Sequence, residues 1–576
     1  MAGTGSTGNF QQTRVQPGRS SMTEPTGEPT VAEMMNTVEP LPSGAEYDYI
    51  IVGAGSAGCV IASRLSEDPK VSVLLVESGG SERNWKFRIP GGQSFVKDWE
   101  RYAWLYQAES DPSRFDRTEI WRRGRILGGS SSINGVIYAI GLPRDFDLWA
   151  EMGALGWSWR DVEPFFRRAE RCPGLQGRGQ SGPVHVEILR SPHRSTGDLI
   201  ASASAVGIQS VRDINLAQGE AIGIAQTNQL RGLRQDSATA YLRPAWRRPN
   251  LRVLTHTQVE KVTFDQGHAS GVQLSVHNKR FEVKARREIV LSAGAFGSPH
   301  LLMLSGIGPA QQLQTHGITV VADSPSVGGN LHDHPELYIE YEVRDRTYSS
   351  AMQWHQLVLS GLQFALARRG QATSCASHIL AYARSSLQEP APDLLLFSGP
   401  WGYLEDNFTF NSRVNTYSLS PSLCHPRSRG RIALRSPDSR VAPLIESNLL
   451  GDRDDVIRLM RGVRLVDRIA RTKPFSDRVI KRVSPDFDLS DDAALEAYIR
   501  ENAGICYHAC GTCRMGDDPS AVVDSQLRVR GVDRLTVADA SVIPLVTSGN
   551  LHAPTVMIGE RAAELLRVPG RITPIR

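Results

Sequence analysis

The chain has 576 residues, more than the ~100–200 of a typical domain, so the sequence predicts two or more structural units. Hydrophobic residues make up 40% and charged residues 22%, which is ordinary globular usage and excludes a wholly disordered chain or a coiled coil. The formal net charge is only +4 and the basic runs are short and scattered, so no nucleic-acid partner is expected.

Residues 1–45 differ in composition from the rest of the chain. They are rich in Gly, Ser, Thr, Pro and Gln and have too few apolar side chains for a core, so we predict a disordered tail in which Met22 offers a second start site. They lack the apolar centre of a secretory signal, and no segment of the chain reaches the ~18 uninterrupted apolar residues of a membrane span. The seven cysteines are odd in number and sparse, which predicts a reducing compartment, the cytoplasm.

Ordered structure is predicted to begin with a strand, a glycine turn and a helix. Residues 47–52 are a β-branched run, residues 53–58 read Gly-Ala-Gly-Ser-Ala-Gly, and residues 59–65 follow as a helix. A second apolar run over residues 71–76 ends at Glu77, which completes a βαβ unit. In such a unit the glycines bring the backbone and a helix N-terminus close to a pyrophosphate, and the acidic residue binds a ribose. A plain α/β turn with a surface glutamate is the alternative interpretation.

Further elements of the same fold are predicted later in the chain. Residues 124–135 are dense in glycine and serine, which brings backbone close to a flat or charged group. Strands are expected at 251–254 and 258–264, and a buried strand followed by a glycine turn at 288–294. Near the end, a strand reaches Asp539, and a helix is expected to open at Pro554.

Taken together, these blocks resemble the glucose-methanol-choline (GMC) family of flavoprotein oxidoreductases over nearly all of residues 46–570. The blocks that carry the resemblance, in chain order, are 53–58 with Glu77, 124–134, 294–309, 508–516 and 539–554. The resemblance implies an α/β fold, α+β overall, with a Rossmann-like FAD-binding domain built from separate segments and a substrate domain whose antiparallel sheet faces the flavin. Among members, it is closest to bacterial choline-dehydrogenase-like and hydroxymethylfurfural-oxidase-like proteins.

The resemblance also predicts how the chain alternates between the two domains. The FAD-binding domain is expected to take residues 46–155, 235–330 and 500–576, and the substrate domain residues 156–234 and 331–499.

The cofactor-binding residues are implied by position within the family blocks. Those expected to contact FAD are Gly53, Gly55, Ser56, Ala57, Gly58, Glu77, Gly128, Ser132, Asn134, Gly135, Val259, Asp539, Ala540 and His552. Some members attach FAD covalently through a histidine in the second block. Ile133 occupies that position here, so non-covalent FAD is expected.

Two histidines are the predicted catalytic residues. An alcohol gives up a hydride from carbon only as its hydroxyl proton leaves, and imidazole can take that proton at neutral pH. His508 matches the family's base. The partner position, histidine in some members and asparagine in others, is assigned to His552, which would steady the developing alkoxide. Most other histidines, such as His268, are interpreted as surface or structural residues.

Two patterns compete with this interpretation. Cys506, Cys510 and Cys513 form a C-x3-C-x2-C spacing that can hold an iron–sulfur cluster, and His508 suggests zinc, but these residues already belong to a flavoprotein block, so no metal is expected. Cys424 lies near the position of a functional cysteine in fatty acid photodecarboxylases of the same fold. A buried small apolar residue is the simpler interpretation of Cys424.

The sequence thus predicts an FAD-dependent enzyme that oxidises an alcohol, best a primary one, to an aldehyde or ketone. A lyase of the hydroxynitrile-lyase type, which keeps FAD redox-silent, and a non-catalytic flavin-binding protein are the alternatives. The acceptor, oxygen or another, the identity of the alcohol and the oligomeric state are left open.

Overall fold

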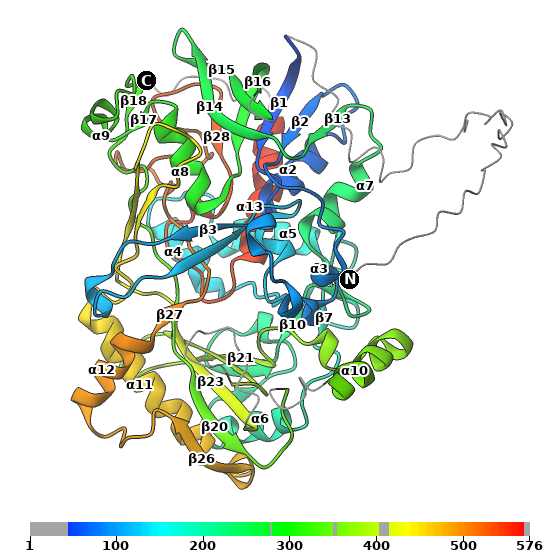
Figure 1. Cartoon of the computed structure of the whole chain (residues 1–576), viewed down its shortest axis with the longest axis vertical. Helices are drawn as coiled ribbons and strands as arrows, with labels where there is room; N and C mark the ends of the chain where they lie inside the picture. The colour runs from blue at the N-terminus through cyan, green and yellow to red at the C-terminus, as the bar shows by residue number, and fades with distance from the viewer. Residues whose placement is uncertain (1–43, 277–278, 349–353, 403–413, 569–576) are drawn as a thin grey trace, which may run out of the picture. The chain divides into compact units, whose positions relative to one another are not determined.

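The computed structural model describes residues 44–276, 279–348, 354–402 and 414–568 (Figure 1). The chain divides into two compact units, residues 1–40 and 41–576, and every described residue belongs to the second. The tail predicted for residues 1–45 therefore lies outside the described residues, except for its last two.

The first sheet has seven strands and is parallel around its centre. Its central strand β1 (Glu46–Val52) pairs with β2 (Val73–Val76) on one side and with β16 (Lys279–Leu291) on the other; β13 (Leu251–Leu254) lies beyond β2, and β28 (Leu535–Val537) joins β16. All of these pairings are parallel. β2 is buried along its whole length, as expected for a strand covered on both faces.

The long strand β16 belongs to two kinds of pairing. Its first half forms an antiparallel meander with β15 (His268–Val276), which in turn pairs with β14 (Gln258–Asp265). In this half most residues are exposed or half-buried, while the last four residues of β16 are all buried. The burial pattern therefore records where the strand passes from the solvated meander into the covered parallel sheet.

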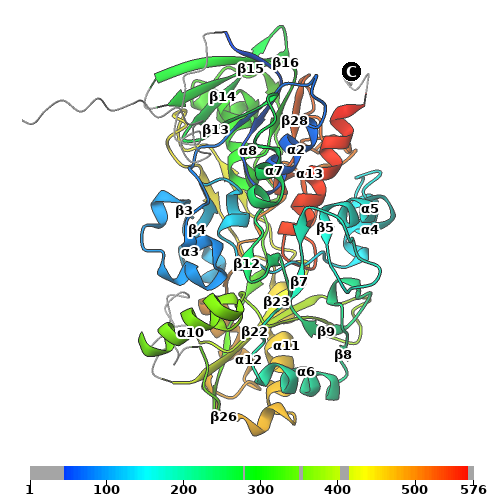
Figure 2. The same ribbon diagram turned by 90° about the vertical axis from the view of Figure 1, so that its right-hand side faces the viewer.

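Two helices that lie side by side on this sheet begin earlier than predicted. α2 (Ser56–Leu65) starts inside the glycine turn rather than after it, so Gly58 stands in its first turn. α13 (His552–Arg567) packs beside α2 (Figure 2) and starts two residues before the predicted Pro554. Proline is accepted in the first turn because the backbone N–H there has no partner within the helix.

The second sheet has nine strands and is antiparallel, except for one parallel pairing between β8 and β9. The strand order is β26-β20-β23-β22-β21-β9-β8; β19 also pairs with β23, and β27 pairs with β19. Their bounds are β8 (Gln209–Ser210), β9 (Ala221–Ile224), β19 (Pro335–Glu336), β20 (Ile339–Val343), β21 (Ile379–Ala383), β22 (Leu394–Gly399), β23 (Thr416–Leu423), β26 (Val479–Ser484) and β27 (Gly504–Ile505). The antiparallel sheet predicted for the substrate domain is confirmed.

One face of this sheet packs on helices and the other turns toward the first sheet. α11 (Arg453–Ala470), α6 (Ser195–Ala205) and α12 (Asp492–Asn502) cover the first face, where Leu394 and Leu396 join their apolar side chains. Alternate residues Leu395 and Phe397 belong to a different cluster on the opposite face. Because side chains along a strand alternate between the two faces of a sheet, the face that carries Phe397 can form the wall of a cavity.

The remaining elements connect or cover the two sheets. They are α3 (Trp85–Arg88), the ribbon β3 (Ala103–Gln107) with β4 (Ile120–Gly124), α4 (Pro143–Glu151), α5 (Trp159–Ala169), α7 (Arg243–Ala245), α8 (Gly294–Leu304), α9 (Ala310–Thr315) and α10 (Trp354–Ala367), with the short strand pairs β5 (Glu170–Arg171) and β6 (Val184–His185), β7 (Glu187–Ile188) and β10 (Gln226–Thr227), β11 (Gln229–Leu230) and β12 (Leu233–Arg234), β17 (Ile307–Gly308) and β18 (Ala322–Asp323), and β24 (Arg431–Ala433) and β25 (Leu444–Glu446). Within the described ranges no helix is long and apolar enough to cross a bilayer. β27 joins the second sheet from residues 504–505, inside the last segment predicted for the FAD-binding domain, and the segment boundaries stay a prediction.

Candidate active site

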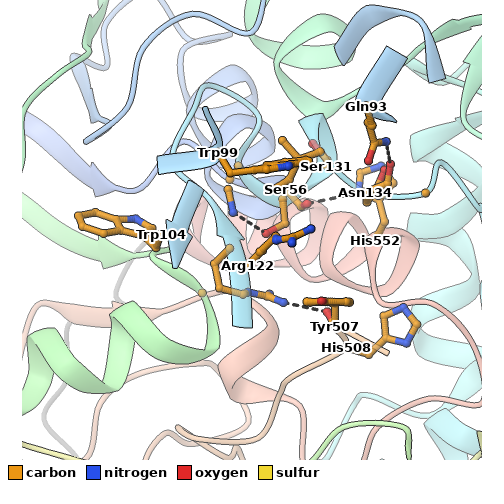
Figure 3. Close-up of a pocket in the computed structure, with 18 of the residues that line it drawn as sticks. Ser56, Gln93, Trp99, Trp104, Arg122, Ser131, Asn134, Tyr507, His508 and His552 are labelled. Atoms are coloured by element: carbon orange, nitrogen blue, oxygen red, sulfur yellow. Dashed lines mark hydrogen bonds between the residues drawn. The ribbon is translucent and has the colours of Figure 1, made fainter. Parts of the chain in front are cut away.

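A cavity of about 1180 Å³ is lined by residues of both sheets. From the first sheet come the ends of β1 and β2, at Val52 and Val76; from the second come Glu336 of β19 and Phe397 of β22. Most of the residues predicted from the sequence lie in its wall (Figure 3). The cavity therefore brings together segments that are hundreds of residues apart in the chain.

The glycine turn after β1 forms one end of the cavity. Gly53, Gly55, Ser56 and Ala57 line it, while Gly58 stands behind them in the first turn of α2. A Cβ on Gly58 would lie 1.9 Å from the carbonyl oxygen of Gly53, so only glycine allows this close approach of helix and turn. The turn thus presents backbone and a helix N-terminus to the cavity, as a pyrophosphate requires.

Glu77 and Val259, both predicted to contact FAD, line the cavity beside this turn. The Glu77 carboxylate already accepts hydrogen bonds from the backbone N–H groups of Ala54 (2.9 Å) and Gly79 (2.8 Å). Burial raises the pKa of Glu77 to about 7, although both hydrogen bonds oppose that shift. Each oxygen keeps a second lone pair, so the residue can still accept from a ribose hydroxyl.

The second glycine block packs against the first. A Cβ on Gly129 would lie 2.7 Å from the Cα of Gly55, which explains the lack of a side chain there. Asn134, Gly135 and Ile133 line the cavity.

Two predicted residues of this block, Gly128 and Ser132, lie behind the cavity wall. The hydroxyl of Ser132 donates to the carbonyl oxygen of Leu127 at 2.6 Å, and the backbone N–H of Gly128 donates to the carbonyl oxygen of Ala54 at 2.8 Å. Both residues shape the turn, while Ser130 and Ser131 face the cavity in their place.

Asp539 and Ala540 line the cavity where β28 ends. Asp539 caps the short helix that follows by accepting from the backbone N–H of Ser541 at 2.7 Å, and its other oxygen accepts from Gly294 at 2.8 Å and from Ser298 at 2.6 Å. The carboxylate therefore ties the end of β28 to the turn after β16.

His508 lies at the other end of the cavity, with its imidazole held by a second histidine. Nδ1 of His508 is 2.9 Å from Nδ1 of His334, and Nε2 of His334 is 2.9 Å from the carbonyl oxygen of Thr547. The carboxyl of Asp333 accepts from the backbone N–H of both His508 (2.8 Å) and His334 (2.7 Å). Sequence reasoning missed His334 and Asp333, because nothing in the local sequence links them to residue 508.

These contacts define which nitrogen of His508 carries the proton. Burial lowers the pKa of His334 to about 4, so its ring is neutral at pH 7. A carbonyl oxygen only accepts, so Nε2 of His334 carries the proton donated to Thr547 and Nδ1 keeps its lone pair. Nδ1–H of His508 must then donate to His334, which leaves Nε2 of His508 unprotonated. Burial, with repulsion from His334 and Arg123, also lowers the pKa of His508.

The side chain nearest to this nitrogen belongs to Asn550, a residue that was not predicted from the sequence. Its amide nitrogen lies 3.0 Å from Nε2 of His508, and both residues line the cavity. An amide N–H and a ring lone pair therefore converge at one point of the wall. Asn550 lies two residues before His552 in the same motif, and the family's use of asparagine at the partner position was the signal that could have found it.

His552 lies elsewhere in the cavity wall, among Ser56, Ser131 and Asn134 (Figure 3). Its Nδ1 is 3.3 Å from the hydroxyl of Ser56, and its Nε2 is buried without a protein partner. Burial lowers the pKa of His552 to about 4, so the ring is neutral. Its predicted contact with the cofactor fits this position, whereas the predicted pairing with the base does not match the contact between His508 and Asn550.

The second sheet supplies a buried carboxylate and aromatic rings to the cavity. Glu336 accepts from the hydroxyls of Ser420 (2.8 Å) and Tyr338 (3.2 Å), and among the described residues it has no ion-pair partner. Burial raises its pKa. The rings of Tyr348 and Trp401 are stacked with centroids 6.3 Å apart and line the same cavity.

The residues of the competing metal and cysteine patterns lie in different surroundings. Within the described ranges, the one group able to hold a metal is His334, Cys506 and His508, and the two histidines are already joined by a hydrogen bond between their Nδ1 atoms. Cys510 and Cys513 are buried apart from it. Cys424 is buried in an apolar cluster and does not line the cavity, which agrees with the structural interpretation.

Comparison with known proteins identifies the family of this chain. Sequence models of GMC oxidoreductases match residues 47–336 and 426–559. The chain is 38% identical over 530 residues to an oxygen-dependent choline dehydrogenase of Rhizobium rhizogenes, covering 90% of this chain and 95% of that protein. It is 39% identical over 532 residues to an uncharacterized GMC-type oxidoreductase of Mycobacterium bovis, covering 91% and 99%.

Solved structures show the same fold. The pyridoxine 4-oxidase of Mesorbium loti superposes with a TM-score of 0.82 at 28% identity, covering 90% of this chain and 98% of that one. A formate oxidase superposes with a TM-score of 0.84 at 25% identity, covering 92% and 99%. The chain therefore belongs to the GMC oxidoreductase family.

Proposed function

We propose that this chain is an FAD-dependent oxidoreductase that converts an alcohol to an aldehyde or ketone, with Nε2 of His508 as the base. The observation that carries the proposal is geometric: Nδ1 of His508 is held by His334, and Nε2 lies 3.0 Å from the amide nitrogen of Asn550, with both residues lining the cavity. A hydride can leave carbon only as the hydroxyl proton leaves, so a base at this point is what the reaction needs. Relatives named as choline dehydrogenase and pyridoxine 4-oxidase support the same reaction class.

Asn550 takes the role of the base's partner in this proposal. A substrate hydroxyl that reaches both side chains from the cavity would donate its proton to Nε2 of His508 and accept the amide N–H of Asn550. As the proton leaves, negative charge grows on the substrate oxygen, and the fixed N–H stabilises it. His552, 3.3 Å from Ser56 of the glycine turn, is assigned to cofactor binding alone.

The cavity residues fit FAD. The glycine turn and helix N-terminus suit the pyrophosphate, and buried polar atoms without protein partners, Nε2 of His552 and Oδ1 of Asn550, belong to residues that line the same cavity. FAD, when bound, supplies the acceptor for the hydride. Ile133 has no nucleophilic atom, so we propose that the cofactor is held without a covalent bond.

Glu336 and the aromatic rings point to an alcohol that carries a cationic group. A buried carboxylate held only by neutral groups, the hydroxyls of Ser420 and Tyr338 and the thiol of Cys506, is costly, and a cationic substrate would offset that cost. Aromatic faces such as those of Tyr348 and Trp401 attract quaternary ammonium groups. The choline dehydrogenases among the relatives support this substrate class.

An anaerobic stopped-flow comparison tests the function and the substrate class together. Choline and its uncharged isostere 3,3-dimethylbutan-1-ol are mixed with the holoenzyme, and flavin absorbance is followed. We expect choline to bleach the flavin and the isostere to do so much more weakly. Glu336→Gln should raise the KM for choline by roughly tenfold or more and leave that of the isostere nearly unchanged, because only choline loses an ion pair.

The outcomes separate the alternatives. No bleaching by any alcohol in a panel, with the flavin still present, would contradict the oxidoreductase and favour a lyase. Bleaching by neutral alcohols alone would keep the reaction and overturn the cationic substrate.

The proposal extends to the location of the protein and to the acceptor that reoxidises the flavin. All seven cysteines are unpaired, which supports a reducing compartment, and we propose the cytoplasm. Oxygen or another acceptor would reoxidise the flavin, and assays with oxygen and with an artificial acceptor in parallel distinguish the two.

A further inference from the structure

The helix α10 has two apolar faces, and one of them is bare. Leu357, Ser360, Gly361 and Phe364 recur at helical spacing and line the cavity. On the opposite side, the side chains of Val358, Leu359, Leu362 and Leu366 are 54, 59, 54 and 87% exposed. Residues 358, 362 and 366 are four apart, so they form a continuous stripe along the helix. Nothing in the enzyme's own cavity requires this second face.

Two aromatic residues from another part of the chain are exposed on the same side of the molecule as α10. Trp85 of α3 and Phe95 are 56 and 40% exposed, and their rings lie 6.1 Å apart. Figure 2 shows α3 and α10 on the same side of the molecule, and both elements contribute to the cavity lining. We call this group the apolar rim: Trp85, Phe95, Val358, Leu359, Leu362 and Leu366. Exposed apolar surface gathered in this way marks an interaction site.

The charged residues that flank the apolar rim in the sequence are mainly positive. α10 has no Asp, Glu, Lys or Arg over its whole length, and Arg368 and Arg369 follow directly, both exposed and without an ion-pair partner among the described residues. Residues 83–101 contain five basic side chains (83, 86, 88, 97, 101) against two acidic ones (98, 100). Apolar side chains bordered by Lys and Arg are the composition that binds the interface of an anionic bilayer.

We propose that the apolar rim docks on the surface of a membrane that contains anionic lipids. A second copy of the chain fits less well, because a two-fold contact would place the basic border against itself. The contact is peripheral: the exposed stripe of α10 and the rings of Trp85 and Phe95 enter the interface, and the basic side chains meet the lipid headgroups. It would bring the side of the cavity lined by α10 to the membrane surface.

A vesicle flotation experiment with the holoenzyme tests the proposal. Vesicles of phosphatidylcholine alone are compared with vesicles of phosphatidylcholine and phosphatidylglycerol. We expect the protein to float with the mixed vesicles, less with the neutral ones, and less as salt screens the charges. Leu362→Asp should lower the partition coefficient by about tenfold or more, since a buried leucine contributes that much. Leu387→Asp, at an 83% exposed leucine outside the rim, is the matched control and should change it little.

Each outcome decides the proposal. A wild-type protein that stays at the bottom of the gradient with both vesicles overturns it, as does a Leu362→Asp variant that floats like wild type. Equal flotation with both kinds of vesicle overturns the proposal that the membrane must contain anionic lipids. Light scattering without vesicles tests the other possible occupant, a second copy of the chain. If Leu362→Asp halves the molecular mass measured for wild type, a second copy covers the apolar rim and the membrane proposal is overturned. Flavin absorbance confirms that each variant is folded, and Leu366→Asp repeats the test at the most exposed position.

Discussion

The two ends of the cavity are built in different ways. At the glycine turn, one short segment presents its backbone to the cavity. The sequence there is constrained because a side chain would clash: a Cβ on Gly58 would lie 1.9 Å from the carbonyl oxygen of Gly53. At the other end, which we call the catalytic end because we propose that the alcohol is oxidised there, side chains of His334, His508 and Asn550 meet from segments 174 and 42 residues apart. The first end is encoded locally, and the second exists only when the chain is folded.

This difference predicts different responses to mutation. The glycine end should be insensitive to changes in distant side chains, because its contacts are made by backbone. The catalytic end should lose function stepwise as each member of its hydrogen-bonded chain is removed, while the cofactor stays bound. Replacing the members of that chain one at a time, with FAD content measured beside the rate, tests the separation.

Replacing the base should have the largest effect on the reaction and little on the cofactor. In His508→Ala we expect the rate of flavin reduction by alcohol to fall by at least ~10²–10⁴-fold, because a positioned base contributes that much. FAD content should match wild type, since the glycine turn is unchanged. Anaerobic stopped flow measures the rate and absorbance the occupancy; reduction at the wild-type rate across neutral pH would show that His508 is not the base.

Asn550→Ala should come next, with a loss of about 10²–10³-fold in the same rate, the usual effect of removing one donor to a developing oxyanion. His552→Ala is the matched comparison on the same motif. In His552→Ala the flavin should be reduced more slowly than in wild type but faster than in Asn550→Ala, because His552 contacts Ser56 rather than the proposed base. The reverse order would restore His552 as the partner of the base.

The sequence was sufficient for the first end of the cavity and only partly for the second. Glycines at fixed spacing, a strand before and a helix after predicted the turn, Glu77 and the parallel sheet, because these features follow from local backbone geometry. The predicted helix starts were two or three residues later than the observed ones, since side-chain patterns do not show where the first backbone hydrogen bond forms.

The catalytic end could be predicted only as far as motifs reach. His508 was found because it lies in a recognisable block, but His334 is 174 residues away and its role depends on a bond to a backbone carbonyl at Thr547. No spacing rule links these positions. Which of Asn550 and His552 contacts His508 likewise could not be read from the sequence, because it depends on where each side chain points at the start of α13.

His334 should act as a positioning residue with a smaller effect. His334→Leu removes the acceptor for Nδ1–H of His508, so part of the population would carry the proton on Nε2 and lose the base; we expect a drop of roughly tenfold. His334→Gln keeps a carbonyl acceptor and should recover much of the rate.

The pH profile separates this role from a structural one. The pKa of His508 is lowered by burial and by His334, so the base stays unprotonated and wild-type flavin reduction should be flat as pH falls to about 6.5, the ordinary histidine pKa. Removing His334 takes away one cause of that lowering, so the acid limb should move to higher pH in His334→Leu. An unchanged profile with a lower rate would indicate packing damage alone.

The smallest effect is expected from deleting residues 1–40. Every residue that lines the cavity lies at Val52 or later. The composition of residues 1–40 offers too few apolar residues to stabilise the fold by burial. FAD content, the rate of flavin reduction and Tm should therefore stay close to those of the full chain, measured by absorbance, stopped flow and thermal unfolding. Loss of FAD on truncation would mean that the glycine end of the cavity depends on a distant segment, and the contrast between a locally encoded and an assembled end would fail.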